Sequence, residues 1–323
     1  MQTLRVGTLN VWNKSGPWAD RLPLIRRDIG QLAPGVLGFQ ELLRLLPEGS
    51  RGDGPEAPPA WRAAGIWGAA LEPYRAEPSG KAPWNSQNDQ LTEILSGLSG
   101  APEHCCFFEA RAYGGGLVMG NGLASRFPIV EARGFALPGE ESGETRCLLY
   151  ALLEAPWGKL PVFVTHLNWK FHHGSVRVRQ VRFIVERMEA LVPEEPSTEQ
   201  RLPAVLLGDF NAEPDSDEIR FLRGLHTLEG RSVHFADTWA WAGEGGPGYT
   251  FDRKNGFALR SNEPPRRIDY VFVRGPDATL RGEPQRTALA FTEPVTSSPS
   301  GAVWPSDHYG LVTDLAVEPR RPR

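Results

Sequence analysis

Short apolar runs, rich in valine, leucine and phenylalanine, recur along the chain and are separated by turn residues. Runs of this kind predict strands that are largely buried. Eight segments qualify: residues 4–12, 35–41, 117–125, 146–155, 160–168, 203–211, 267–275 and 310–318. Their number predicts that β-sheet makes up much of the fold.

Four other segments have apolar side chains spaced three and four residues apart, which is typical of amphipathic helices. In residues 18–33, Leu24, Ile25, Ile29 and Leu32 form one apolar stripe. The other three segments are residues 88–98, 175–191 and 216–225. Many strands with few helices predict an α/β protein in which two sheets pack face to face and helices lie outside them.

Residues 44–86 differ from the rest, because they are rich in Pro, Gly and Trp and show little periodicity. We expect a long irregular excursion, and excursions of this length in compact domains are usually functional or disordered. Its Trp61, Trp67 and Trp84 cover a core edge or form a stacking lid, and both alternatives stay open. Without a repeat or a clear linker, residues 1–318 are expected to form one domain and 319–323 a tail.

The charge balance limits the possible partners. The chain has 323 residues, with 35 basic and 39 acidic side chains and a formal net charge of -4. It is therefore no general polycation, and any nucleic-acid binding needs a local basic patch. The three cysteines, Cys105, Cys106 and Cys147, suit neither a disulfide framework nor a zinc site, so we expect buried thiols.

The first residues lack the basic and apolar regions of a signal peptide. No stretch approaches the 18 uninterrupted apolar residues of a membrane span. We therefore expect a cytoplasmic monomer without a transmembrane segment.

Polar side chains stand where several of the predicted strands end. They are Asn10, Glu41, His166, Asp209 with Asn211, Asp269, and Asp307 with His308. A carboxylate or imidazole next to a buried strand needs partners. These groups can partner one another, together with a metal ion and a phosphate group.

Metal-assisted hydrolysis of a phosphate ester fits this set of residue types. Glu41 is a hard oxygen ligand suited to Mg²⁺ or Mn²⁺, and Mg²⁺ usually takes one or two protein carboxylates plus substrate phosphate and water. The metal would polarise a phosphoryl oxygen and neutralise charge on the leaving group.

The other residues suit the remaining parts of such a reaction. Asp209 can orient and deprotonate a water molecule, and Asn211, two residues on, can face the same site and donate its amide to phosphate. His308, held by Asp269 or Asp307, can act as a charged donor to the phosphate.

Seven motifs occur in an order known from one family: TLNVW, GFQE, GNGLASRFPI, VTHLNW, LLGDFNAEP, RIDYVFVRG and SDHYGLV. Together they make the chain resemble the endonuclease/exonuclease/phosphatase superfamily, the deoxyribonuclease I-like proteins, from residue 4 to about 317. The resemblance implies a four-layer α/β/β/α sandwich, two packed mixed sheets flanked by helices, with the active site at one end. It also implies a metal-dependent hydrolase acting on phosphate ester bonds.

The resemblance assigns roles to individual residues. It implies Asn10 and Glu41 at the metal with Asp307 as a further ligand, Asp209 as water activator, His166 and Asn211 near the phosphate, an Asp269–His308 pair, and Asn121 close to the site. Residues 44–86 do not align, which leaves the substrate contacts rather than the chemistry open.

A phosphodiester is the expected substrate, and nucleic acid is favoured. Aromatic and basic residues alternate after the THLN motif, where Trp169 and Lys170 are candidate substrate contacts, and Arg253 and Lys254 follow later in the chain. The acidic total charge weakens this argument. A phospholipid, sphingomyelin or inositol phosphate on the same scaffold stays open, since residues 44–86 could supply an apolar loop for lipid.

Each residue alone also has a simpler interpretation. Asp209 and Asn211 are common turn residues. His172 and His173 are adjacent and are interpreted as loop residues. Three arginines of the 175–191 helix, Arg177, Arg179 and Arg182, favour a solvated face over a phosphate track. Arg146 is either a strand-end ion pair or a cation of the site.

Two other functions compete with a phosphoesterase. A serine acyl hydrolase using Ser306, Asp307 and His308 is weak, because adjacent residues rarely form a triad and no G-x-S-x-G motif is present. An inactive binding module on the same scaffold should have lost Glu41, Asp209 or His308, and all three are present.

Overall fold

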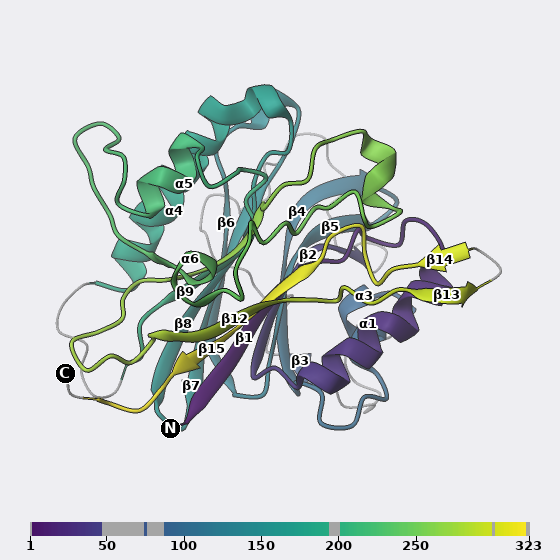
Figure 1. Ribbon diagram of the computed structural model, residues 1–323, viewed down its shortest axis with the longest axis horizontal. Helices are drawn as coiled ribbons and strands as arrows, with labels where there is room; N and C mark the ends of the chain where they lie inside the picture. The colour runs from purple at the N-terminus through teal and green to yellow at the C-terminus, as the bar shows by residue number, and fades with distance from the viewer. Residues whose placement is uncertain (1, 47–73, 76–86, 194–200, 299–300, 321–323) are drawn as a thin grey trace.

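The computed structural model describes residues 2–46, 74–75, 87–193, 201–298 and 301–320. Most of the segment 44–86, with its three tryptophans, therefore lies outside the described residues, as does the end of the tail. Two large mixed sheets make up the centre of the molecule, and helices flank them on both sides (Figure 1).

The first sheet contains both ends of the described chain. Its order is β12 (Pro284–Ala290), β15 (Gly310–Ala316), β1 (Thr3–Asn10), β2 (Val36–Leu45), β5 (Leu117–Ser125), β4 (His104–Gly114) and β3 (Tyr74–Arg75). The β1 and β2 strands run parallel, whereas β1 and β15 are antiparallel. The sheet is therefore mixed, as predicted.

The second sheet comes from the middle of the chain. Its order is β10 (Ala236–Asp237), β11 (Asp269–Val273), β9 (Val205–Asp209), β8 (Gly158–His166), β7 (Cys147–Ala155) and β6 (Ile129–Ala136). Here β8 and β9 are parallel and the other pairs are antiparallel. A small separate ribbon consists of β13 (Val295–Ser298) and β14 (Gly301–Val303).

The helices are short except for two. They are α1 (Trp18–Leu32), α3 (Gln90–Leu95), α4 (Gly174–Leu191), α5 (Asp217–Leu222) and α6 (Thr238–Ala242), with 3-10 turns η2 (Glu140–Ser142), η3 (Phe171–His173) and η4 (Ala258–Ser261). All four helices expected from periodicity are confirmed, although α3 and α5 are shorter than predicted.

The alternation of side chains along each strand explains the layering. Along β9, Leu207 packs in the core between the sheets, whereas Leu206 packs on the opposite face in a core with α4. Along β2, Val36 and Leu37 divide in the same way between the central core and a core with α1. Both sheets are apolar on both faces, so each needs a helical cover. This is the predicted four-layer α/β/β/α sandwich.

Two glycines allow close approach beside the later site. A Cβ on Gly38 of β2 would lie 2.1 Å from Leu207 of the facing sheet. A Cβ on Gly208 would lie 1.9 Å from the carbonyl oxygen of Thr165, and its φ of +144° also suits glycine alone. The glycine of the GDFN motif therefore serves the packing of β9 against β8.

Two expectations outside the strands need correction or detail. The solvated face predicted for the arginines of α4 is wrong for Arg177, which is buried and whose Nε donates to Glu218 at 2.6 Å. His172 is exposed but His173 is buried and lies 3.2 Å from the amide nitrogen of Asn168. The three cysteines are buried and free, as predicted. Among the described residues, no helix is long and apolar enough to cross a membrane.

Candidate active site

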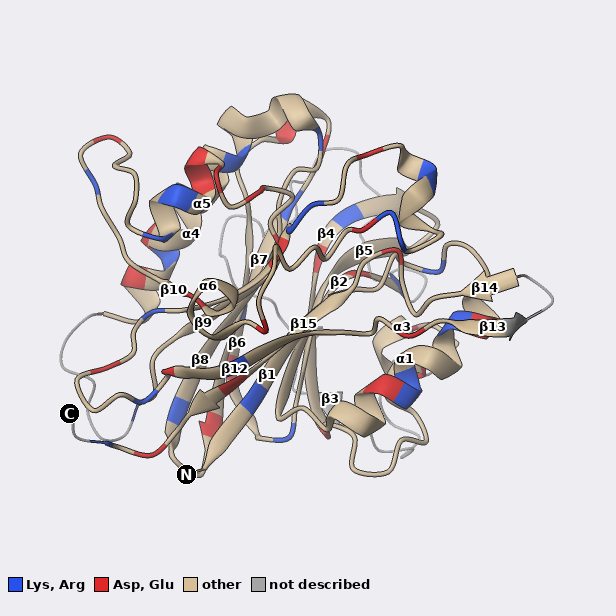
Figure 2. Cartoon of the chain, in the orientation of Figure 1, with Lys and Arg blue, Asp and Glu red and all other residues tan. Residues whose placement is uncertain are grey.

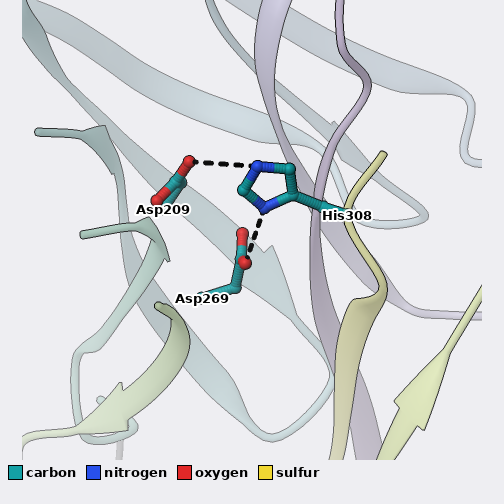
Figure 3. A group of neighbouring side chains, drawn as sticks. All are labelled: Asp209, Asp269 and His308. Carbon is teal, nitrogen blue, oxygen red and sulfur yellow. Dashed lines mark hydrogen bonds and ion pairs between the residues drawn. The ribbon is translucent and has the colours of Figure 1, made fainter. Parts of the chain in front are cut away.

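Strand register brings three of the predicted residues side by side. His166, the last residue of β8, pairs with Asp209, the last residue of β9. Asp209 pairs in turn with Asp269, the first residue of β11. The three side chains therefore stand in one row across adjacent strands, where the strands end. Figure 3 shows Asp209 and Asp269 with their carboxylates close to the ring of His308.

The first sheet supplies residues to the same place. Asn10 ends β1, and the hydroxyl of Ser306 donates to its carbonyl oxygen at 2.6 Å, which holds the Asp307–His308 segment next to β1. Asn10 also donates from its amide to Asp209 at 3.0 Å. The ends of both sheets thus meet in one site, although the residues are far apart in sequence.

Two site residues have left-handed backbone conformations that are uncommon for residues with a Cβ. Glu41 has a φ of +62° and occupies an irregularity of β2, between Phe39 and Leu42, where the pairing with β5 shifts register. Asn211 has a φ of +51°. A left-handed residue costs about 1–2 kcal/mol, and such strain clusters at functional sites. The bulge interrupts the alternation of β2 where Glu41 joins the site.

Asp209 is the most heavily contacted carboxylate of the site. Its Oδ1 accepts from the backbone N–H of Asn211 at 2.8 Å, and its Oδ2 accepts from Asn10. His166 Nε2 and His308 Nε2 lie 3.4 and 3.8 Å from the same Oδ2. Burial, reinforced by the charge of Asp269, raises the pKa of Asp209 to about 7, although His308 and the hydrogen bonds oppose the shift.

His308 lies between two carboxylates (Figure 3). Its Nδ1 lies 2.9 Å from Asp269 Oδ2, and its other ring nitrogen faces Asp209. Burial by itself would lower the pKa of His308, but the charges of Asp269 and Asp209 outweigh it and raise the pKa well above the usual value. The two carboxylates therefore favour the protonated imidazolium form of His308. Asp269, one of its two candidate partners, is the residue that its Nδ1 contacts.

His166 has the opposite charge state. Burial lowers its pKa well below the usual value, and the positive charges of Arg146 and His308 lower it further. The Nη1 atom of Arg146 lies 3.1 and 3.2 Å from the two ring nitrogens of His166. His166 is therefore neutral, and it offers one donor and one acceptor to its surroundings.

Asn10 contacts Glu41, a second of the three residues predicted to bind metal. Its amide donates to Glu41 Oε1 at 3.3 Å, and the amide of Asn13 donates to Glu41 Oε2 at 3.1 Å. Desolvation raises the pKa of Asp307 to about 6, with His308 opposing this shift and Glu41 adding to it. Two carboxylates that disfavour each other's charge fit a divalent cation, and oxygen donors are the ligands that Mg²⁺ and Mn²⁺ prefer.

A second group of possible ligands is Asp209, Asp269 and His308, whose donor atoms lie within 4.8 Å of one another. This group fits a cation less well, because a protonated histidine cannot bind metal and its charge already balances the carboxylates. The Glu41 and Asp307 carboxylates therefore fit a divalent cation better than this group does.

Most of these groups line one cavity of about 380 Å³. Seven of the ten predicted site residues line it, namely Asn10, Glu41, His166, Asp209, Asn211, Asp307 and His308. Asp269 does not line the cavity but contacts His308, which does. A larger cavity of about 530 Å³ is lined by Pro128 and by residues of the 95–104 segment. Its lining lacks such a convergence of buried acids and imidazoles, so the chemistry belongs to the smaller cavity.

Besides Asp269, two predicted residues do not line this cavity. Asn121 is buried, and its amide donates to the carbonyl oxygen of Cys147 at 3.0 Å, where it links β5 to β7 in the central core. Lys170 is half-buried, and its backbone carbonyl accepts from Arg177 and from the backbone N–H of His173, both at 2.9 Å. Asn121 and Lys170 therefore make contacts within the fold and do not form part of the cavity wall.

Comparison with models of protein families identifies the family of this chain. The model of the Endonuclease/Exonuclease/phosphatase family matches residues 7–308. The chain belongs to this family. Membership makes the protein a metal-dependent hydrolase acting on phosphate esters, and the matched span includes every residue of the site described above. No curated protein matches the chain.

Solved structures of the endonuclease/exonuclease/phosphatase family have the same fold. A family member from Beutenbergia cavernae is 23% identical with a TM-score of 0.64, covering 98% of this chain and 72% of its own. TDP2 from D. rerio, solved with a single-strand DNA product, is 18% identical with a TM-score of 0.60, covering 98% and 99%. The mannosyl-6-phosphatase Bt3783 from Bacteroides thetaiotaomicron is 18% identical with a TM-score of 0.63, covering 97% and 99%.

Several cavity residues of this family member could not be assigned from the sequence. Arg146, left open as an ion pair or a site cation, is both, since its Nη2 donates to Glu144 at 3.1 Å and it lines the cavity. Asn13 and Arg266 were not singled out. Arg146 directly precedes β7, so its place at a strand end is visible in the sequence. Asn13 and Arg266 have no such signal, because neither directly adjoins a strand.

Proposed function

We propose that this protein hydrolyses a phosphodiester by direct attack of water, with Mg²⁺ or Mn²⁺ as its metal and nucleic acid as its substrate. The observation that carries the proposal is the arrangement around Asp209. Asp209 and the imidazoles of His308 and His166 line one cavity together with Glu41 and Asp307, the two carboxylates that we propose as metal ligands.

Asp209 is the proposed general base. A base works best when its pKa is close to the working pH, and burial brings the pKa of Asp209 to about 7. The hydrogen bonds from Asn10 and Asn211 hold both carboxylate oxygens in place. Asp209 can therefore orient the attacking water and accept its proton.

His308 is the proposed charged donor to the phosphate. The Asp269 carboxylate keeps its ring protonated and in a fixed orientation. An imidazolium in a partly closed cavity stabilises the negative charge that develops on the phosphoryl oxygens. The edge of the Phe251 ring, with ring centroids 5.1 Å apart, packs against His308 and limits its movement.

Neutral donors and a guanidinium complete the phosphate contacts. The Asn211 amide uses one N–H on the carbonyl of Leu167 at 3.0 Å, which leaves its second N–H for a phosphoryl oxygen. His166 and Arg146 line the same wall. The Nε of Arg146 is buried without a hydrogen-bond partner in the described structure, so this side chain has unused donor capacity next to the substrate position.

Glu41 and Asp307 would hold the metal, with Asn10 close to both Glu41 and Asp209. The bound ion would polarise a phosphoryl oxygen and neutralise charge on the leaving group. Asn10 and Asn13 orient the Glu41 carboxylate from both sides, which favours one fixed position for the ion.

A phosphomonoesterase is the second candidate, because a cavity of about 380 Å³ accommodates a small phosphorylated sugar as well as one nucleotide. The neighbour from Bacteroides thetaiotaomicron is a mannosyl-6-phosphatase. A lipid or inositol phosphate ester is a third substrate class for the same chemistry. We also propose that the protein is a cytoplasmic monomer. Cell fractionation tests the location, and light scattering tests the oligomeric state.

The deciding experiment is hydrolysis of a substrate panel with Mg²⁺, Mn²⁺ or EDTA. The panel contains single- and double-stranded DNA, RNA, abasic DNA, sphingomyelin, inositol phosphates, mannose 6-phosphate and an aryl phosphodiester. Metal-dependent cleavage of a nucleic acid that Asp209→Asn abolishes supports the proposal. Cleavage of only the sugar phosphate would replace it with the phosphomonoesterase.

A further inference from the structure

Half-exposed aromatic rings stand on two rims of the catalytic cavity. Trp169 follows β8 of the second sheet and is 49% exposed, and Tyr113 lies near the end of β4 of the first sheet and is 50% exposed. Both line the cavity. Two half-exposed rings that both line one catalytic cavity offer flat apolar faces to a ligand bound there.

Arginines contact aromatic rings near both rims. The Arg111 guanidinium lies over the Tyr113 ring at 5.2 Å from its centroid. The Arg266 guanidinium lies over the ring of Phe171, two residues after Trp169, at 4.6 Å from its centroid. Arg266 is buried and paired with Glu263, yet its Nε has no hydrogen-bond partner within the described structure. Both arginines line the cavity, so each aromatic rim also offers positive charge.

Hydrogen bonds to the backbone hold the segment around Trp169 in place. The backbone N–H of Trp169 donates to Glu144 at 3.3 Å, and the same carboxylate oxygen accepts from Arg146. Arg177 donates to the carbonyl oxygens of the residues on either side of Trp169, Asn168 and Lys170. Hydrogen bonds thus hold the backbone of this segment, while the indole of Trp169 remains half-exposed.

Further basic residues lie in the loop that precedes Arg266. Three exposed basic residues, Arg253, Lys254 and Arg260, belong to the loop that carries the cavity residues Ser261 and Glu263. Figure 2 shows basic segments on this loop, around the short helical turn at the upper right of the view. A chain with a net charge of -4 thus has a local basic stretch that leads away from the site, as binding of a polyanion requires.

We propose that Trp169 and Tyr113 stack on unpaired bases on either side of the scissile phosphate, so that the protein acts on single-stranded nucleic acid. This inference rests on the proposed function. Stacking needs a base whose face is free, which a duplex does not offer without unpairing. Arg266 and the basic loop that precedes it then contact the phosphates next to the cleaved one.

The test compares KM values for three oligonucleotides of equal length. One is single-stranded, one is the same strand in a duplex, and one is a single strand with tetrahydrofuran residues in place of the nucleosides around the cleavage site. We expect KM for the intact strand to be about 10-fold lower than for the other two, since stacking of one base has about this effect. Trp169→Ala and Tyr113→Ala should each raise KM for the intact strand and so shrink its advantage over the base-free strand.

Matched controls separate stacking from a general loss of structure. Trp241 is also 49% exposed and does not line the cavity, so Trp241→Ala should keep the full difference between the strands. Trp169→Phe retains a ring and should recover most of the affinity. Binding of the intact strand to Asp209→Asn, measured by fluorescence anisotropy with and without the Trp169 change, tests the same contact without turnover.

Two negative outcomes have different meanings. Equal KM values for the base-bearing and base-free strands would overturn the stacking role and leave a phosphodiesterase that reads only the backbone. Absence of metal-dependent cleavage of every phosphodiester, with no binding of the strand to Asp209→Asn, would overturn the proposed function and this inference together.

Discussion

The amide of Asn10 donates a hydrogen bond to Asp209 at 3.0 Å, across 199 positions of sequence and between the two sheets. The same amide donates to Glu41 at 3.3 Å. One side chain therefore connects the carboxylate that is assigned to the metal with the carboxylate that is assigned to the attacking water. The relative position of metal and water depends on how the sheets pack, because Asn10 and Asp209 come from facing layers.

Replacement of Asp209 tests the assignment of the base. We expect Asp209→Asn to lower kcat by at least about 100-fold, the usual effect of removing a proton-transfer group. The fold should survive, because an amide occupies nearly the same volume, and circular dichroism checks this. A folded variant that keeps full turnover would rule out this role for Asp209.

The Asp269–His308 contact predicts strong coupling between two substitutions. We expect His308→Gln and Asp269→Asn each to lower kcat by about 100-fold. Because Asp269 acts through His308, the double variant should be hardly worse than the single ones. Additive losses in this double-mutant cycle would show that the two side chains act independently.

Metal titration tests the role of Glu41. We expect Glu41→Gln to shift the Mg²⁺ concentration for half-maximal activity upward by at least about 10-fold, since it removes one of two carboxylate ligands. Glu263→Gln is the matched control, because Glu263 lines the same cavity but pairs with Arg266 rather than with Asn10. An unaltered titration of the Glu41 variant would contradict ligation.

The charge state of His308 predicts how stability depends on pH. A folded-state pKa above the unfolded value of about 6.5 gives stability that is complete below pH 6.5 and is lost as the pH rises through the folded pKa. In EDTA, the difference in unfolding free energy between the wild type and His308→Gln should therefore shrink as the pH rises above 6.5. Urea denaturation at several pH values measures it, with His226→Gln, outside the site, as the control.

Arg21 gives a prediction about stability. It is fully buried in α1 and donates to the carbonyl oxygens of Val11, Ser15 and Pro305, so it joins the loop after β1 to the segment before Asp307. We expect Arg21→Met to lower the free energy of unfolding by about 3 kcal/mol, because it leaves buried carbonyls unpaired. Arg260→Met, on the surface, should change it by less than about 0.5 kcal/mol.

The sequence predicted the architecture well because burial has a strong local signature. The runs around Leu206 and Val36 are apolar on both faces, and this pattern requires a buried strand in a layered protein. Strands such as β4 and β6 were missed, since their exposed ends contain polar residues, for example Arg111 and Glu131, that dilute the apolar run.

The site was predicted where its residues follow buried strands and was missed elsewhere. Asp209 and His166 end apolar runs, so their polarity stands out. Arg146 and Arg266 are ordinary arginines in sequence, and only tertiary packing places them on the cavity wall. The left-handed backbone at Glu41 has no sequence signal at all, because glutamate rarely adopts it.

The antiparallel pairing of β1 with β15 determines how the protein could be attached to a support. Thr3 pairs with Ala316 at one end of the sheet, whereas Asn10 and His308 lie at the other. Eight residues of strand separate these ends, which is about 25 Å. A tether attached before β1 or after β15 would therefore lie at the end of the sheet opposite the site. The catalytic cavity would then face the solvent and stay accessible to a polymeric substrate.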